Sequence, residues 1–126
     1  IIEIHLADGM PSVLASKNQL RQVFLNMFHN AGDAMPDGGI LTVKTAVEDG
    51  EIAIEISDNG IGINEKDIKN IFDAFFTTKS SVKGVGLGLS VCYGFIAEHG
   101  GDIQVTSEQG VGTCFKITLP VYVQSL

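Results

Sequence analysis

Basic residues are scarce in this sequence of 126 residues, which has eight Lys and Arg against 15 Asp and Glu and a net charge of −7. So few cations do not form the basic surface that nucleic-acid binding requires, and we therefore expect no nucleic-acid partner. The negative charge does not exclude a nucleotide, because a metal ion can balance its phosphates.

Cysteine and long apolar runs are scarce as well. Cys92 and Cys114 are the two cysteines, without CxxC spacing, which argues against a disulfide framework and predicts free thiols in a reducing, cytoplasmic compartment. No apolar run approaches the length that spans a bilayer, so we expect no membrane contact by this chain. Because the chain begins with Ile1 and not with Met, we expect a fragment of a longer protein, which can itself be membrane-anchored.

The signatures of three familiar nucleotide-binding classes are missing. The sequence has no GxxxxGK[ST], no HRD and no DFG. The stretch "GVGLGL" (84–89) has Leu89 where GxGxxG needs its third glycine, and no strand immediately precedes it. These absences exclude the P-loop, dinucleotide-binding and protein-kinase-like classes.

The patterns that are present predict one domain over residues 1–126, of the α+β class. We expect strands at 1–6, 40–47, 51–57, 103–106 and 113–119, and helices from Ser16 to about Met35, from Asn64 to about Ile71 and from about Leu87 to Glu98. Ser16 with Gln19 is a capping-box signature, and Asp49-Gly50 is a hairpin turn. Hairpins and helices that occur in blocks favour a mixed or mostly antiparallel sheet.

Oxygen-bearing side chains line one stripe of the first long helix. Asn26, Asn30 and Asp33 are spaced i, i+4 and i+7, at the border of the apolar face. Such oxygens suit a hard cation such as Mg²⁺. The helix alone favours ordinary boundary residues that bond to backbone or water, because metal motifs as loose as this one have many false matches.

A second candidate is "SDNGIGI" (57–63), directly after the strand with Ile52, Ile54 and Ile56. Asp58 lies where the strand ends and a glycine-rich loop begins, a common place for ligand contacts. Its carboxylate accepts hydrogen bonds only, so it can bind the exocyclic amine of adenine and would repel the oxygen of guanine. The alternative is a common Asp-Asn-Gly turn.

Two glycine-containing loops complete the candidates. "FDAFFTTK" (72–79) and "SSVKGVGLGLS" (80–90) have the composition of a mobile lid that closes over phosphates, with Lys79 or Lys83 as a point charge. "EQGVGTCF" (108–115) is a tight hairpin in which Thr113 opens the last strand, and its hydroxyl either donates to a ligand or satisfies the turn. A plain surface loop is the alternative for the first.

Six stretches, in their order along the chain, resemble the N box, glycine boxes and F box of the catalytic ATP-binding domain of sensor histidine kinases. They are "NMFHNAGDAM", "DNGIGI", "FDAFFTTK", "GVGLGLSV", "HGGDI" and "GVGTCFKITLP". The resemblance covers essentially the whole chain. It implies the Bergerat fold, a two-layer α/β sandwich with a mixed, mostly antiparallel sheet and helices on one face, which binds ATP and Mg²⁺.

The resemblance also implies a site. Asn30 would bind Mg²⁺, Asn26 would support the metal and phosphates, Asp58 would bind the adenine amine and Thr113 would support Asp58. The other residues that it implies for the nucleotide site are Asp33, Gly60, Gly62, Ile63, Lys79, Gly84, Gly86, Leu87, Gly88 and Leu89. Val85 departs from the family pattern, which often has Thr there.

Asn26 also bears on the activity. Related ATPases of this fold, such as gyrase, have a Glu there as general base, and an amide cannot take a proton at neutral pH. The resemblance therefore implies that ATP is held for a His on a separate dimerisation domain in two-component signalling, with a response regulator downstream. We interpret His5, His29 and His99 as structural. An anti-sigma-factor-like serine kinase and a non-catalytic nucleotide-binding module are the alternatives.

Overall fold

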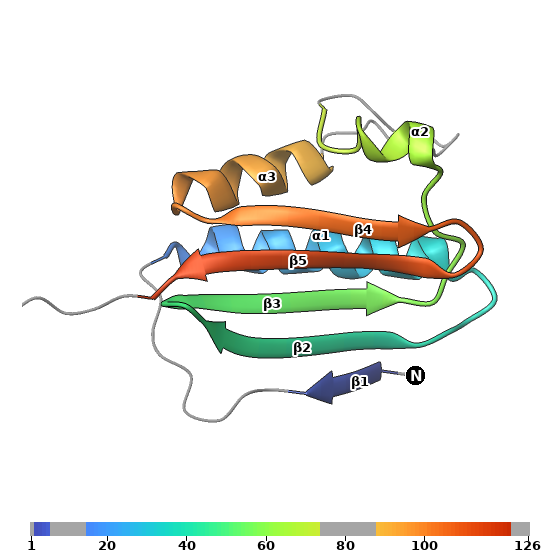
Figure 1. The fold of residues 1–126 in the computed structure, drawn as a ribbon, viewed down its shortest axis with the longest axis horizontal. Coiled ribbons are helices and arrows are strands. Elements are labelled where there is room, and N and C mark those ends of the chain that lie inside the picture. The colour runs from blue at the N-terminus through green and yellow to red at the C-terminus, as the bar shows by residue number, and fades with distance from the viewer. Residues whose placement is uncertain (1, 6–14, 74–87, 122–126) are drawn as a thin grey trace, which may run out of the picture.

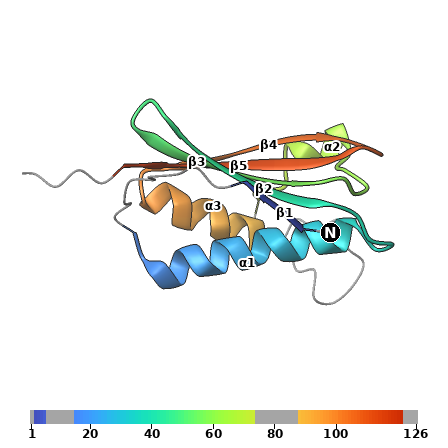
Figure 2. The ribbon, with the colours of Figure 1, turned by 90° about the horizontal axis from the view of Figure 1, so that it is seen from below.

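A five-stranded sheet with two long helices packed on one face forms the molecule (Figures 1 and 2). The computed structural model describes residues 2–5, 15–73 and 88–121. Its elements are β1 (Ile2–His5), α1 (Lys17–Ala34), β2 (Leu41–Glu48), β3 (Glu51–Asp58), α2 (Glu65–Ile68), α3 (Gly88–Glu98), β4 (Asp102–Glu108) and β5 (Gly112–Pro120).

The strand order is β1-β2-β3-β5-β4. β1 runs parallel to β2, and every other neighbouring pair is antiparallel. Helices α1 and α3 lie on the same face of this sheet (Figure 2), and α2 lies beside β4. The predicted fold class is therefore confirmed.

Helix α1 begins where its capping signature predicts. The Ser16 hydroxyl accepts a hydrogen bond from the Gln19 backbone N–H at 3.3 Å, which satisfies one of the unpaired amides of the first turn. Val23, Met27 and Ala31 recur at helical spacing and are buried against the sheet. The helix ends at Ala34, just before Pro36 and the glycine pair that follows it.

The core lies between these two helices and the middle of the sheet. Every second residue of β3, from Ile52 to Ile56, faces it, as the alternation predicts. Cys92 and Ile96 of α3 and Ile117 of β5 are completely buried there. Burial of these apolar side chains is the main source of stability for a sandwich of this kind.

The β2–β3 turn has the backbone that its sequence predicts. Asp49 and Gly50 have φ angles of 47° and 79°, so both are left-handed, as a two-residue hairpin of this type requires. This turn sets the register in which Leu41 lies opposite Asp58. It thereby fixes which residues share the end of the sheet with Asp58.

Helix α2 is shorter than predicted. Asn64 caps it as expected, through its side-chain oxygen and the Lys66 N–H at 2.8 Å. The helix ends at Ile68 and not near Ile71, because the backbone then forms successive turns closed by bonds three residues apart. The β4–β5 hairpin is longer than predicted, extending from Asp102 to Pro120.

His99 connects the two long helices by hydrogen bonds, at the start of α1 and the end of α3. The His99 Nε2 accepts a hydrogen bond from the Ser16 backbone N–H at 2.9 Å, and its Nδ1 lies 2.6 Å from the Phe95 carbonyl. Nδ1 therefore carries the proton and donates it to Phe95. His99 thus joins the start of α1 to the end of α3, in agreement with a structural role.

Candidate functional site

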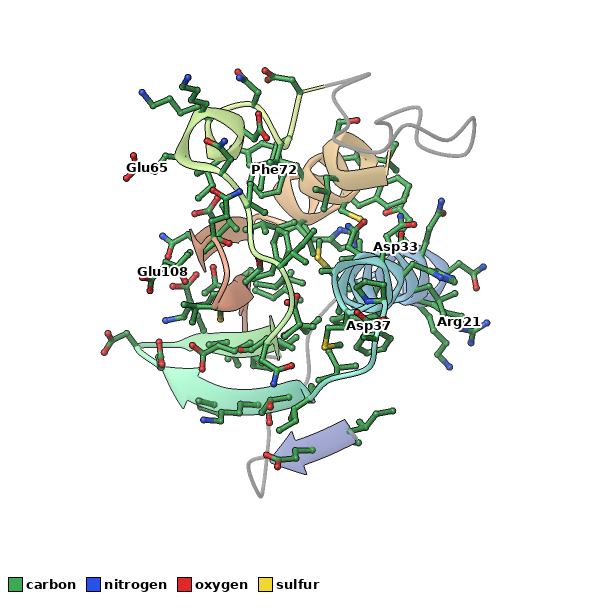
Figure 3. The ribbon with its side chains drawn as sticks, turned by 90° about the vertical axis from the view of Figure 1, so that its right-hand side faces the viewer. Arg21, Asp33, Asp37, Glu65, Phe72 and Glu108 are labelled. Carbon is green, nitrogen blue, oxygen red and sulfur yellow. The ribbon has the colours of Figure 1, made fainter. Side chains whose placement is uncertain are left out.

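The carboxyl ends of β3 and β4, the end of α1 and the start of β5 lie together at the end of the molecule that faces the viewer in Figure 3. Helix α3 begins further back, beside the middle of α1 (Figure 1). Asp58 is the last residue of β3, and its side chain lies on the face of the sheet that the helices cover, like that of Ile56. Its cross-strand neighbour on β5 is Thr113. The sequence-predicted pair of Asp58 and Thr113 is thus adjacent in the fold.

Two backbone amides hold the Asp58 carboxylate. The Gly60 N–H donates to Asp58 Oδ1 at 2.9 Å, and the Thr113 amide also stabilises the charged form. Burial acts in the opposite direction and is the larger effect, so the pKa of Asp58 is raised above its ordinary value. A half-buried carboxylate with fixed orientation and acceptor capacity left over is suited to binding a donor group.

Thr113 belongs to a hydroxyl network that the sequence reasoning missed. Its side chain is only 6% exposed, and its Oγ1 lies 2.8 Å from the Oγ of Ser107 on β4. Ser107 also accepts from the Ile63 N–H at 2.7 Å and donates to the Gly112 carbonyl at 2.9 Å. The available signal was alternation, because Ser107 continues the inward-facing positions of Ile103 and Val105.

The first glycine loop is packed against protein backbone on two sides. A side chain on Gly60 would meet the Ala34 carbonyl oxygen at 2.2 Å, and one on Gly62, whose φ is +74°, would meet that of Glu108 at 2.3 Å. The Ile61 N–H bonds to Ala34 O at 2.9 Å. These glycines are thus required within the chain itself, between the end of α1 and the β4–β5 turn.

On α1, the polar stripe lies beside α3. The Asn26 Nδ2 donates to the Cys92 sulfur at 3.4 Å. A side chain on Gly88 would lie 3.8 Å from Asn26 Oδ1, so the amide oxygen lies near the first turn of α3. Asn30 is half-buried one turn further along α1, and Asp33 is exposed near the end of that helix (Figure 3).

The remaining predicted residues divide into two groups. Ile63 and Leu89 are partly buried and pack against the core, and Gly88 is the first residue of α3. Lys79, Gly84, Gly86, Leu87 and the rest of the predicted lid between residues 74 and 87 lie outside the described residues. Phe72 precedes that stretch, and its ring lies 5.3 Å from the Tyr93 ring and 6.4 Å from the Phe115 ring, centroid to centroid (Figure 3).

A hollow lies on the opposite face of the sheet. It is open, has a volume of about 310 Å³, and is lined by Glu3, Ile40, Thr42, Ser57, Asp58 and Asn59. The side chains of Thr42 and Ser57 alternate with those that face the helices. This hollow therefore lies across the sheet from Asn26 and Asn30 and shares Asp58 with the candidate site.

Comparison with known proteins agrees with this arrangement. The profile of the family described as histidine kinase-, DNA gyrase B- and HSP90-like ATPases matches residues 15–123. Sporulation kinase E of Bacillus subtilis is 45% identical over 122 residues, which are 95% of this chain and 16% of that protein. The sensor histidine kinase ZraS of Escherichia coli K12 is 38% identical over 114 residues, 90% of this chain and 24% of that protein.

Solved structures agree as well. The nucleotide-free catalytic domain of the histidine kinase ThkA superposes with a TM-score of 0.83 at 29% identity, over 95% of this chain and 78% of that one. Full-length ShkA in complex with AMPPNP gives 0.78 at 31% identity, over 99% of this chain and 27% of that one.

These matches define the class of protein. The chain belongs to the family of histidine kinase-, gyrase B- and HSP90-like ATPases, and it is an ATP-binding catalytic domain of the sensor histidine kinase type. It spans about a fifth of the length of the curated kinases that it matches. Among the helices of the described residues, none combines the length and the apolar character needed to cross a membrane.

Proposed function

We propose that this chain, as one domain of a longer cytoplasmic or membrane-anchored sensor kinase, binds Mg-ATP and donates the γ-phosphate to a histidine on a separate helical dimerisation domain. A response regulator would then receive the phosphate. The single observation that carries the proposal is the pair of Asp58 and Thr113, which are cross-strand neighbours held at the end of the sheet.

Adenine recognition follows from Asp58. Its carboxylate is already oriented by the Gly60 N–H and offers its remaining lone pairs to the exocyclic amine of the base. Because the carboxylate is half-buried, a bond to it loses little to competing water. A base with an oxygen in that position would meet an acceptor and be rejected.

The phosphates would extend toward α1 and α3. The amide oxygen of the half-buried Asn30 is of the type that binds Mg²⁺ together with phosphate oxygens, so the residues present fit this cation. Bound Mg²⁺ would supply charge neutralisation for the transferred phosphoryl group. The N-terminus of α3, at Gly88, adds a favourable environment for a phosphate.

Asn26 supports transfer to an outside nucleophile over hydrolysis. Its amide is engaged with Cys92 and cannot act as a general base toward water. We therefore expect the chain alone to hydrolyse ATP very slowly. Its residues hold and orient the nucleotide, and the attacking imidazole comes from the partner domain.

The test is a transfer assay with γ-labelled ATP, Mg²⁺ and the dimerisation domain of the same protein. We expect acid-labile label on that domain, as a phosphohistidine gives. Asn30→Asp, which places an additional negative charge beside the phosphates, should weaken Mg-ATP binding and transfer. Asn18→Asp makes the same change at an exposed position of α1 and should not. Acid-stable label on serine alone would support the serine kinase instead.

A further inference from the structure

Ser107 stands out because its one hydroxyl makes three contacts, with the first glycine loop and with the start of β5. Its Oγ lies within hydrogen-bonding distance of the Ile63 N–H in the first glycine loop and of two groups at the start of β5, the Gly112 carbonyl and the Thr113 hydroxyl. We infer that Ser107 is a positioning residue that determines nucleobase specificity, by fixing the direction in which the Thr113 hydroxyl points. The inference rests on the proposed function, because it concerns the base of the same nucleotide.

Counting protons gives one consistent assignment for this network. Ser107 has one hydrogen and two lone pairs. The Ile63 N–H, at 2.7 Å, uses one lone pair, and the Gly112 carbonyl, at 2.9 Å, can only accept, so it takes the hydrogen. The second lone pair of Ser107 then accepts the hydrogen of Thr113 across 2.8 Å. All three contacts are satisfied only when Thr113 is the donor to Ser107.

This assignment determines what Thr113 presents to a ligand. With its hydrogen held by Ser107, its Oγ1 offers lone pairs only. Asp58, the cross-strand neighbour of Thr113 on the same face, is also an acceptor. The two side chains therefore form an acceptor pair that matches an amino-purine and is mismatched to an oxo-purine. Without Ser107, the Thr113 hydroxyl could rotate and donate to an oxo group.

Base selectivity is the readout that separates this role from a structural one. The loss of the Ser107 bonds to Ile63 and Gly112 would loosen the site and weaken all nucleotides alike. The loss of control over Thr113 would change the ratio of affinities for ATP and inosine triphosphate, which differ in the amino or oxo group of the base.

We would measure both affinities calorimetrically for the 126-residue chain and its variants, with thermal melting as a check of folding. Ser107→Ala should reduce the ratio of the affinity for ATP to that for inosine triphosphate by about fivefold, which corresponds to the free energy of one neutral hydrogen bond. Ser107→Thr keeps the hydroxyl and should retain the preference. Thr106→Ala removes an exposed hydroxyl from the other face of the same strand and should change nothing. If Ser107→Ala does not fold, Ser107→Cys, with its weakly bonding thiol, takes its place with the same expectation.

The double variant tests the route of the effect. In a Thr113→Val background, which lacks the hydroxyl, Ser107→Ala should leave the ATP-to-inosine-triphosphate ratio unchanged. An unchanged ratio in folded Ser107→Ala with Thr113 intact, or a further change in the Thr113→Val background, would overturn the inference. A wild-type chain that binds neither nucleotide would instead overturn the proposed function itself.

Discussion

Asp58→Asn should separate ligand binding from folding, because it changes the group that faces the ligand and keeps the bond to Gly60. In the wild type the Gly60 N–H donates a hydrogen bond to Asp58 Oδ1 at 2.9 Å. The variant keeps a side-chain oxygen that can accept this hydrogen bond. Its amide nitrogen then occupies the position that would meet the nucleobase amine, so a donor faces a donor. A hydrogen bond to a charged acceptor contributes about 1.5–3 kcal/mol, so we expect ATP affinity to fall by about 10- to 150-fold.

The free energy of unfolding at pH 7, unlike the ATP affinity, should not decrease in this variant. Burial raises the pKa of Asp58, so the folded state favours the protonated carboxyl. The stabilisation by this group is complete below the unfolded-state pKa of about 4 and is lost as the pH rises through the higher folded-state pKa. Asn does not titrate, so the variant should lose this part of the pH dependence and be no less stable than the wild type at pH 7.

Titration calorimetry with ATP at pH 7 and urea unfolding from pH 3.5 to 7 would measure the two effects. Asp37→Asn removes a carboxylate from the exposed loop after α1 and serves as the matched control for charge. Unchanged ATP affinity in Asp58→Asn would refute the site assignment. A variant that is clearly less stable than the wild type at pH 7 would refute the account of the carboxylate's environment.

Two further predictions concern the glycine loop and the buried thiol. Gly62→Ala should destabilise the fold by more than Gly50→Ala in urea unfolding. Both glycines have a positive φ, where a side chain costs about 1–2 kcal/mol. At Gly62, but not at Gly50, the new carbon would also meet a carbonyl oxygen, that of Glu108. Equal losses would contradict the close contact. Cys92 is fully buried with a raised pKa, so a thiol reagent followed by peptide mapping should label it only above the unfolding midpoint, and labelling in the native protein would contradict its placement.

The local features of the fold were predictable because short-range physics determines them. The Ser16 cap, the Asp49-Gly50 turn and the inward isoleucines of β3 each depend on a few neighbouring residues. Asp58 at the strand end and the glycine-rich loop after it were also readable, because composition changes abruptly there. Their roles in nucleotide binding stay predictions that depend on the experiments above.

The features that the sequence did not predict depend on contacts between distant segments. The insertion of β5 between β3 and β4 is a matter of topology, which periodicity does not specify. Ser107 lies 44 residues from Ile63, and Asn26 lies 66 residues from Cys92, so neither hydrogen bond leaves a local pattern. The early end of α2 is a local exception, because turns closed by bonds three residues apart replace the helical bonds after Ile68.

The hydrogen bonds of the His99 imidazole hold one end of α3 in place. The imidazole fastens the last turn of α3 to the start of α1, while the first residue of α3, Gly88, lies at the opposite end beside Asn26. An 11-residue helix is about 16 Å long, so each degree of tilt about His99 displaces Gly88 by about 0.3 Å and leaves the fastened end in place. A small rocking of α3 is therefore converted into its largest displacement at the end where the phosphates would bind.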